Sequence, residues 1–344
     1  MQCREAVLLG GSGEIARAMD LLRGAWRRAK NGDNAAGRFS ALDGMALVLS
    51  MQGAYIESQA TAIDAYRIAI ALQDKARAVH ALTTVVYASA FIMDGNAFLA
   101  GILDRCLAEA VTIGEPTLLM HVHNTRALLL VRQRRFDAAL EEIAIVRSLL
   151  PRTDGTLPES IVAVYEVAMR VRKARVSVGG ERSRIQAEAE AAADIARQTA
   201  TRAGNREALA RLDYSLGCLR RQQGRHNEAL AALHNALALS HSMKLLYGAT
   251  IIQLEQAEAY RDLGQFDDAL SSYEGAHLSA ELCRPCKELH LASKGLADVH
   301  ELRGDRAVAV RMRDVAEREA RQHERECESA QLALNELWRE IEKA

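Results

Sequence analysis

Apolar residues recur three and four positions apart along almost the whole chain, and short polar or glycine-containing segments interrupt the pattern. This spacing gathers the apolar side chains on one face of a helix, so it predicts a series of amphipathic helices. A turn followed by a new helix recurs about every 40 residues, at 52–57, 135–140, 223–230, 263–270 and 303–310. A period of this size predicts an array in which each helix pair packs against the next.

Small residues occupy fixed places relative to these turns. Seven positions before the turn lie Ala6, Ala46, Ala88, Ala127, Gly217, Ala257 and Ala297. Five positions after it lie Ala18, Ala100, Ala139, Ala229, Ala269 and Ala309, with Ser58 as the exception. Small side chains at such positions let two antiparallel helices approach closely.

The pattern gives about eight helix pairs. Their expected ranges are 1–9 with 13–31, 38–73, 76–112, 117–150, 158–176 with 182–203, 206–242, 246–281 and 286–321. Around 176–180 the spacing is about ten residues too long for the repeat, and we expect a longer loop there.

The last helix continues beyond the repeat, because 306–344 contains neither Pro nor Gly. Ala330, Leu334, Leu337 and Ile341 are spaced alternately four and three apart, which is a heptad stripe. We expect a coiled-coil helix in which Leu334, Leu337 and Ile341 form a parallel dimer. The alternative is that this stripe folds back on the chain's own array. The expected division is therefore a repeat array over 1–305 and a signalling helix over 306–344.

The spacing of small residues and turns resembles that of the tetratricopeptide repeat (TPR) family. Leu216, Gly217 and Tyr260 match its first helix, and Phe136 and Phe266 match the aromatic residue at its turn. The resemblance implies an all-α, right-handed TPR-like superhelix. The period exceeds the family's usual one, and the Trp of the family's first helix is absent. The long last helix resembles the linker of bacterial TPR-containing diguanylate cyclases, which would place the chain in a sensor region before a GGDEF domain.

In TPR proteins the first helix of each pair lines a concave groove. Carried onto this chain, the groove positions include Asn124, Tyr165, Arg172, Arg211, Tyr214, Arg221 and Arg261. The N-terminal repeats contribute Leu47, Val85, Ser89 and Ile92 instead, so we expect the groove to change from apolar to Arg- and Tyr-rich. Arg and Tyr suit carboxylates and extended peptides, which predicts a protein or peptide partner.

Composition fits this interpretation. Hydrophobic residues make up 49% of the chain but aromatic residues only 4%, and there are four Pro. A net charge of −1 gives no field that favours nucleic acid or an anionic membrane. We find no apolar run long enough for a membrane span and no signal-peptide core, so we expect a cytoplasmic protein.

Candidate chemistry is sparse. Cys283 and Cys286 form the one compact cysteine motif, in which a redox-active pair, a metal site and two ordinary thiols remain open. His121 and His123 lie two apart and so face different sides of a helix. No catalytic constellation, cofactor motif or metal motif can be drawn.

The sequence therefore predicts a non-enzymatic protein- or peptide-binding sensor or scaffold in bacterial signalling, without a cofactor. One alternative is the ligand-sensing helical-repeat region of a transcription activator. Another is a thiol redox protein that uses Cys283 and Cys286.

Overall fold

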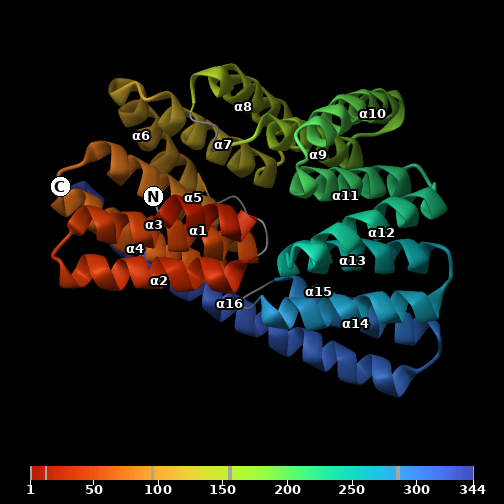
Figure 1. Ribbon diagram of the computed structural model, residues 1–344. Coiled ribbons are helices and arrows are strands. Elements are labelled where there is room, and N and C mark those ends of the chain that lie inside the picture. Colours follow the sequence, from red (N-terminus) through yellow and green to blue (C-terminus); the bar gives the residue numbers. More distant parts are fainter. Residues whose placement is uncertain (1, 12–13, 94–96, 154–156, 284–286, 344) are drawn as a thin grey trace. The chain divides into compact units, whose positions relative to one another are not determined.

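The computed structural model of the chain describes residues 2–11, 14–93, 97–153, 157–283 and 287–343. Over these residues it consists of helices joined by short turns (Figure 1). The α-helices are α1 (Gln2–Gly11), α2 (Ile15–Asn31), α3 (Ala35–Gln52), α4 (Tyr55–Ala71), α5 (Lys75–Ile92), α6 (Ala97–Ile113), α7 (Pro116–Arg132), α8 (Phe136–Leu149), α9 (Glu159–Val176), α10 (Gly179–Arg202), α11 (Arg206–Gln222), α12 (His226–Ser242), α13 (Leu246–Asp262), α14 (Phe266–Leu282), α15 (Glu288–Leu302) and α16 (Arg306–Lys343). A short 3₁₀ helix, η1 (Leu150–Arg152), follows α8.

Within each unit the helices pack as successive antiparallel pairs, and first helices of neighbouring pairs also contact one another, as α5 does with α7 and α11 with α13 (Figure 1). The all-α repeat fold predicted from the sequence is confirmed. The longer loop expected at 176–180 is wrong. Only Ser177 and Val178 separate α9 from α10, because Gly179 has a φ of +57° and starts the next helix at once.

The predicted register of small residues is confirmed. Ala46, Ala257, Ala269 and Ala297 are all completely buried. At Gly217 a Cβ atom would lie 2.6 Å from Leu233 Cγ, so α11 and α12 approach more closely there than an Ala would allow. The small residues are therefore the points at which paired helices touch.

The turns explain the Gly of the repeated motif. Gly264 has a φ of +72°, in the left-handed region that favours glycine. Arg134 stands at the equivalent turn between α7 and α8 and has a φ of +58°. The repeat thus keeps the same backbone conformation where its Gly is missing.

The described chain divides into two compact units, which differ from the domains expected from the sequence. Unit 1 comprises 1–162 together with 326–344, and unit 2 comprises 163–325. Helix α16 therefore belongs to unit 2 in its first part and to unit 1 from Glu326 onward.

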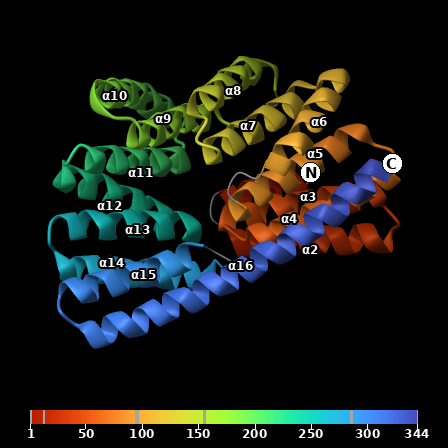
Figure 2. The same ribbon diagram turned by 180° about the vertical axis from the view of Figure 1, so that it is seen from behind.

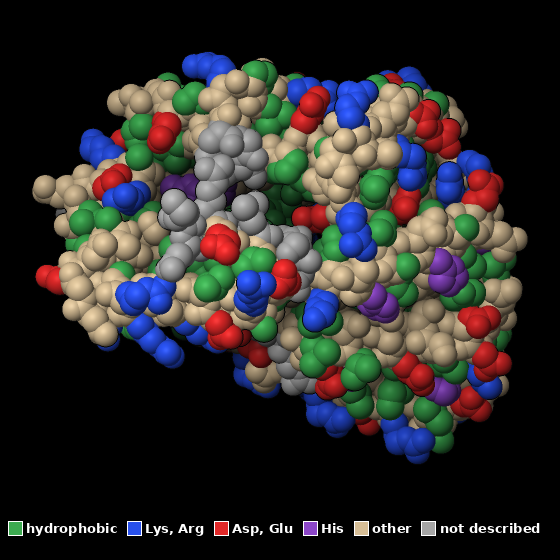
Figure 3. All heavy atoms as spheres, viewed as in Figure 1, with side chains coloured by type: hydrophobic (Ala, Val, Ile, Leu, Met, Phe, Trp, Pro, Cys, Tyr) green, Lys and Arg blue, Asp and Glu red, His purple; other side chains and the backbone are tan. Residues whose placement is uncertain are grey.

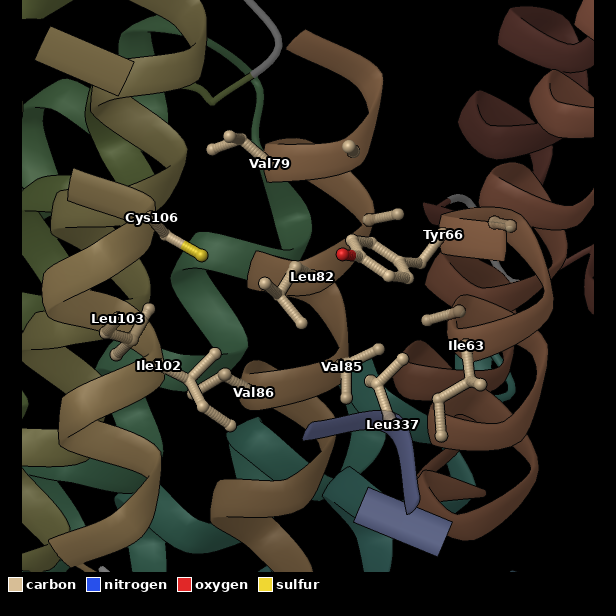
Figure 4. Close-up of a cluster of buried hydrophobic side chains, with 14 of the residues drawn as sticks. Ile63, Tyr66, Val79, Leu82, Val85, Val86, Ile102, Leu103, Cys106 and Leu337 are labelled. Atoms are coloured by element: carbon tan, nitrogen blue, oxygen red, sulfur yellow. The ribbon is translucent and has the colours of Figure 1, made fainter. Parts of the chain in front are cut away.

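The expected dimerisation stripe is corrected by the structure. Leu334 and Leu337 are completely buried and Ile341 is 3% exposed within unit 1. They belong to the same hydrophobic cluster as side chains of α4, α5 and α6. Leu337 points toward Val85 of α5 and Ile63 of α4 (Figure 4). The stripe contacts the chain's own helices, as in the alternative interpretation, and leaves no apolar strip there for a second chain.

None of the described helices combines the length and the apolar content that crossing a membrane would require.

Candidate functional site on the first helices of unit 2

The predicted Tyr and Arg positions of unit 2 lie on three consecutive first helices. Tyr165 and Arg172 are on α9, whereas Arg211, Tyr214 and Arg221 are on α11. Arg261 is on α13. We call the surface formed by these side chains and their direct neighbours the first-helix surface of unit 2. On the face of unit 2 seen in Figure 3, basic, acidic and hydrophobic side chains are interspersed.

Tyr214 and Cys218 lie at the centre of this surface, one turn apart on α11, and their side chains share a hydrogen bond. The pKa of the Tyr214 phenol is raised well above its usual value by Cys218, by burial and by Glu255, against an opposing effect of Arg172. The pKa of the Cys218 thiol is also raised, chiefly by burial and then by Glu255. Both groups therefore stay neutral near pH 7 and act as hydrogen-bonding groups rather than as charges.

Arg221 is held by acidic side chains of α13. Its guanidinium Nε lies 2.7 Å from Glu255 Oε1, and Nη1 lies 3.0 Å from Asp262 Oδ2. The Arg221 side chain is only 17% exposed, so these charge-assisted bonds are shielded from water. Its pKa is raised by the two carboxylates against the opposing effect of burial. Arg221 therefore fixes α11 to α13 and is not available as an open carboxylate-binding fork.

Arg261 is occupied in a similar way. It forms an ion pair with Glu258, and Glu258 also accepts a 2.5 Å hydrogen bond from the phenol of the buried Tyr273. Burial and this carboxylate raise the pKa of Tyr273, so the phenol keeps its proton and remains a donor. This cluster joins α13 to α14 next to the first-helix surface of unit 2.

The exposed cations of the surface are Arg172 and Arg211. The part of the chain that the structure describes provides no ion pair for Arg172, although this side chain lies close enough to influence both Tyr214 and Cys218. Arg211 is half exposed and lies 2.7 Å from Glu207 one turn before it. Arg211 and Glu207 both act on the phenol of Tyr165, whose pKa is raised mainly by burial. The structure thus brings together five predicted residues, Tyr165, Arg172, Arg211, Tyr214 and Arg221, with Arg261 paired beside them.

Asn124 is partly buried on α7 in unit 1. The first helices of that unit carry a histidine cluster that the sequence interpretation missed. His80 Nε2 of α5 lies 3.1 Å from Asp43 Oδ1 of α3, and the His80 ring stacks on that of His121 of α7 at 4.5 Å. His123 instead pairs with Glu142, so the two neighbouring histidines face different sides, as predicted.

The expected apolar lining of unit 1 is wrong for α5. Val85 and Ser89 are completely buried and Ile92 is 7% exposed, because they face the core and the end of α16. The side of α5 that faces its neighbouring first helices carries His80 and Thr84 instead. Thr84 lies one position before Val85, and His80 lies one turn before Thr84. The sequence could have indicated this cluster, because Asp43 and His121 both fall at groove positions of the predicted register.

For the thiol alternative, the structure describes Cys283. Cys283 is 3% exposed, and burial raises the pKa of its thiol to about 12. A thiol that keeps its proton at neutral pH is a poor nucleophile. Cys286 lies outside the described residues. Among the described residues no group of three His, Cys, Asp or Glu side chains is arranged to hold a metal ion.

Comparisons with known proteins place this arrangement within a fold class. No protein-family model and no curated protein matches the sequence. Among solved structures, the chain is similar to a Rap protein complexed with competence and sporulation factor, with a TM-score of 0.57 and 12% identity over 83% of this chain and 77% of that one. It is also similar to yeast Tom70, with a TM-score of 0.51 and 13% identity over 100% of this chain and 68% of that one. A third similar structure is NprR in complex with its cognate peptide NprX, with a TM-score of 0.50 and 14% identity over 77% and 74% of the two chains. The chain has the all-α fold of TPR-like helical repeats.

Proposed function

We propose that this chain is a non-enzymatic protein- or peptide-binding module, and that the first-helix surface of unit 2 binds the partner. One observation carries the proposal. Tyr165 and Arg172 of α9 lie close to Arg211 and Tyr214 of α11, the two Arg side chains are exposed and the two Tyr partly buried, while Arg221 and Arg261 are held in ion pairs beside them. Binding surfaces commonly combine such aromatic and Arg side chains on a rigid support.

The similar solved structures support the same class of function. NprR is seen with a cognate peptide, and the Rap protein is seen with competence and sporulation factor. At 12–14% identity these likenesses concern the fold, so the ligand of this chain has to be inferred from its own residues.

The chemistry favours an extended peptide segment with an acidic side chain or carboxylate. Arg172 supplies a guanidinium fork for the carboxylate, and the neutral phenols of Tyr165 and Tyr214 offer hydrogen bonds and apolar ring faces. Glu255 and Glu258 are neutralised by Arg221 and Arg261 and therefore repel an acidic ligand less than isolated carboxylates would.

We propose bacterial signalling as the process and the cytoplasm as the location, on the basis of the resemblance to sensor regions. Transmission through a dimerising stripe is not part of this proposal, because Leu334 and Leu337 are buried in unit 1.

Selection of linear peptides from a random display library on the unmodified chain tests the proposal. Enriched peptides should carry an acidic residue. Their affinity, measured by fluorescence anisotropy, should fall at least about tenfold for Arg172→Glu with Arg211→Glu, since a close charge pair is replaced by repulsion. The melting temperature should stay nearly constant, because exposed charges contribute little to folding.

Arg311→Glu with Arg318→Glu provides the matched control. Both residues are exposed on α16, so this pair changes the net charge equally without touching the proposed surface. Peptides that bind all variants alike would refute this location, and a library that yields no binder would refute peptide binding itself.

A further inference from the structure

Unit 1 contains a segment that comes from a distant part of the chain. Residues 326–343, which we call the docked segment, pack on α4, α5 and α6 although all of unit 2 intervenes in the sequence. Figure 2 shows this end of α16 lying across α4 beside α5. This contact is additional to the packing of the repeats, because α4, α5 and α6 already pack against their own repeat neighbours.

The contacts combine an apolar centre with a polar rim. Leu334, Leu337 and Ile341 join the cluster that contains Ile63 and Val85. The Cys327 thiol donates to the backbone oxygen of Ile92 at 3.3 Å. We call the side of α4, α5 and α6 that receives these residues the docking face.

At the rim, two interactions fix the direction and rotation of the docked segment. Arg67 donates to both carboxylate oxygens of Glu340, at 2.9 and 3.2 Å. Glu336, one turn earlier, also acts on the Arg67 guanidinium. The ring of Trp338 meets that of Phe98 edge-on, with centroids 5.4 Å apart. The docking face therefore selects an amphipathic helix with acidic residues beside its apolar stripe.

We propose that the docking face is a binding site for an amphipathic helix of a partner protein, and that the docked segment occupies it as an exchangeable intramolecular ligand. The partner helix carries large apolar residues at the spacing of Leu334, Leu337 and Ile341. It also carries carboxylates at the places of Glu336 and Glu340. This is helix-in-groove recognition, in which three or four anchors of one helix face carry the affinity.

The form of the docked segment supports an exchangeable role. Its stripe has the heptad spacing of helices that pair with other helices. Its ion pair with Arg67 is about half exposed on both sides, so the rim contributes specificity more than stability. The affinity thus rests on a few apolar anchors that another helix can reproduce.

Tethering determines how the exchange is measured. A covalently attached ligand acts at an effective concentration on the order of millimolar, so it masks its site against an added helix. The probe is a fluorescent synthetic peptide of residues 326–343, and the protein is the full chain. The unmodified chain should bind this probe weakly. Leu337→Asp in the chain should weaken its own docked segment and increase the affinity for the probe at least about tenfold.

Leu332→Asp is the matched control, since it introduces the same charge into the same segment at a side chain that is 64% exposed. It should bind the probe as weakly as the unmodified chain. In the Leu337→Asp chain, Arg67→Glu should reduce the affinity, and a probe with Glu336→Arg and Glu340→Arg should recover it. A folded Leu337→Asp chain that does not bind the probe would overturn the proposal.

Hydrogen exchange of the unmodified chain decides the matter if Leu337→Asp does not fold. An exchangeable segment should lose its protection through local opening while α5 remains protected. Equal protection of the docked segment and α5, lost only on global unfolding, would mark the segment as a permanent part of the core. A dimer of the unmodified chain that Leu337→Asp makes monomeric would assign the docking face to a second copy and also overturn the proposal.

Discussion

The guanidinium of Arg67 on α4 and the carboxylate of Glu340 on α16, 273 positions apart in the chain, form two hydrogen bonds of 2.9 and 3.2 Å. Beneath them Leu337 is completely buried. An exposed ion pair and a buried apolar anchor thus stand side by side in one contact. They differ greatly in what they contribute to the stability of unit 1.

Leu337→Ala should destabilise unit 1 by about 2–5 kcal/mol, since it removes buried apolar atoms and leaves a cavity. Urea unfolding followed by tryptophan fluorescence measures this, because the two Trp of the chain, Trp26 and Trp338, both lie in unit 1. Leu332→Ala should change the unfolding free energy by less than about 0.5 kcal/mol. A neutral Leu337→Ala would contradict the burial of this side chain.

A double-mutant cycle of Arg67→Ala and Glu340→Ala should give a coupling of about 0.2–1 kcal/mol, because both side chains are about half exposed. The coupling should shrink further at high salt. A coupling above about 2 kcal/mol would mean that the pair is shielded from water in a way that the structure does not show.

Gly295→Ala should destabilise unit 2. A Cβ atom at this position of α15 would lie 2.1 Å from the Tyr273 ring, which is itself buried and bonded to Glu258. Overpacking of this kind costs about 1–3 kcal/mol. Gly101→Ala is the control: it lies within α6 with open space around it and should be stabilising by about 0.5–1 kcal/mol. Thermal melting followed by circular dichroism should show the two shifts in opposite directions.

Arg134→Gly should stabilise the chain, although the change removes a side chain. The φ of +58° at Arg134 is strained for any residue with a Cβ atom, and glycine relieves about 1 kcal/mol of that strain. Gly264→Ala makes the opposite change at the equivalent turn, where φ is +72°, and should be destabilising. The two melting temperatures, compared with that of the unmodified chain, check the sign of each effect.

The sequence predicted what depends on local repetition. The small residues at Ala46, Ala257 and Ala269 established the register, because every helix pair needs the same close approach. The sequence did not predict which helices the stripe of Leu334 and Leu337 would pack against. A heptad stripe specifies an apolar neighbour but not whether that neighbour belongs to the same chain.

The candidate site was predicted to a similar extent. The register placed Tyr165, Arg172, Arg211 and Tyr214 on one surface, but it did not reveal that Arg221 is held by Glu255 and Asp262 of the next helix. Such pairing depends on side-chain geometry between repeats, which spacing along the chain does not encode. The same limit hid the contact of His80 with Asp43 and His121.

The histidine cluster of unit 1 makes stability depend on pH in two opposing ways. Despite burial, Asp43 raises the pKa of His80, with a smaller contribution from Glu115, and the pKa of Asp43 is lowered in return. The stabilisation by His80 is fully present below the unfolded pKa of about 6.5 and is lost as pH rises through the raised folded pKa. The stabilisation by Asp43 is present above about pH 4 and is lost as pH falls through its lowered folded pKa.

His121 has the opposite sign to His80, because its pKa is lowered rather than raised. Burial and the neighbouring His80 lower its pKa to about 3, against a smaller effect of Asp43, and Thr84 Oγ1 lies 3.3 Å from its Nε2. Below about pH 6.5 the unfolded chain protonates this histidine while the folded chain does not, so the contribution of His121 to stability falls by about 1–2 kcal/mol at pH 5. His121→Gln should remove most of that fall, as measured by urea unfolding with tryptophan fluorescence at both pH values. His241→Gln, at an exposed position of α12, should leave the fall unchanged. If His121→Gln loses as much stability at pH 5 as the unmodified chain, His121 does not stay neutral in the folded protein.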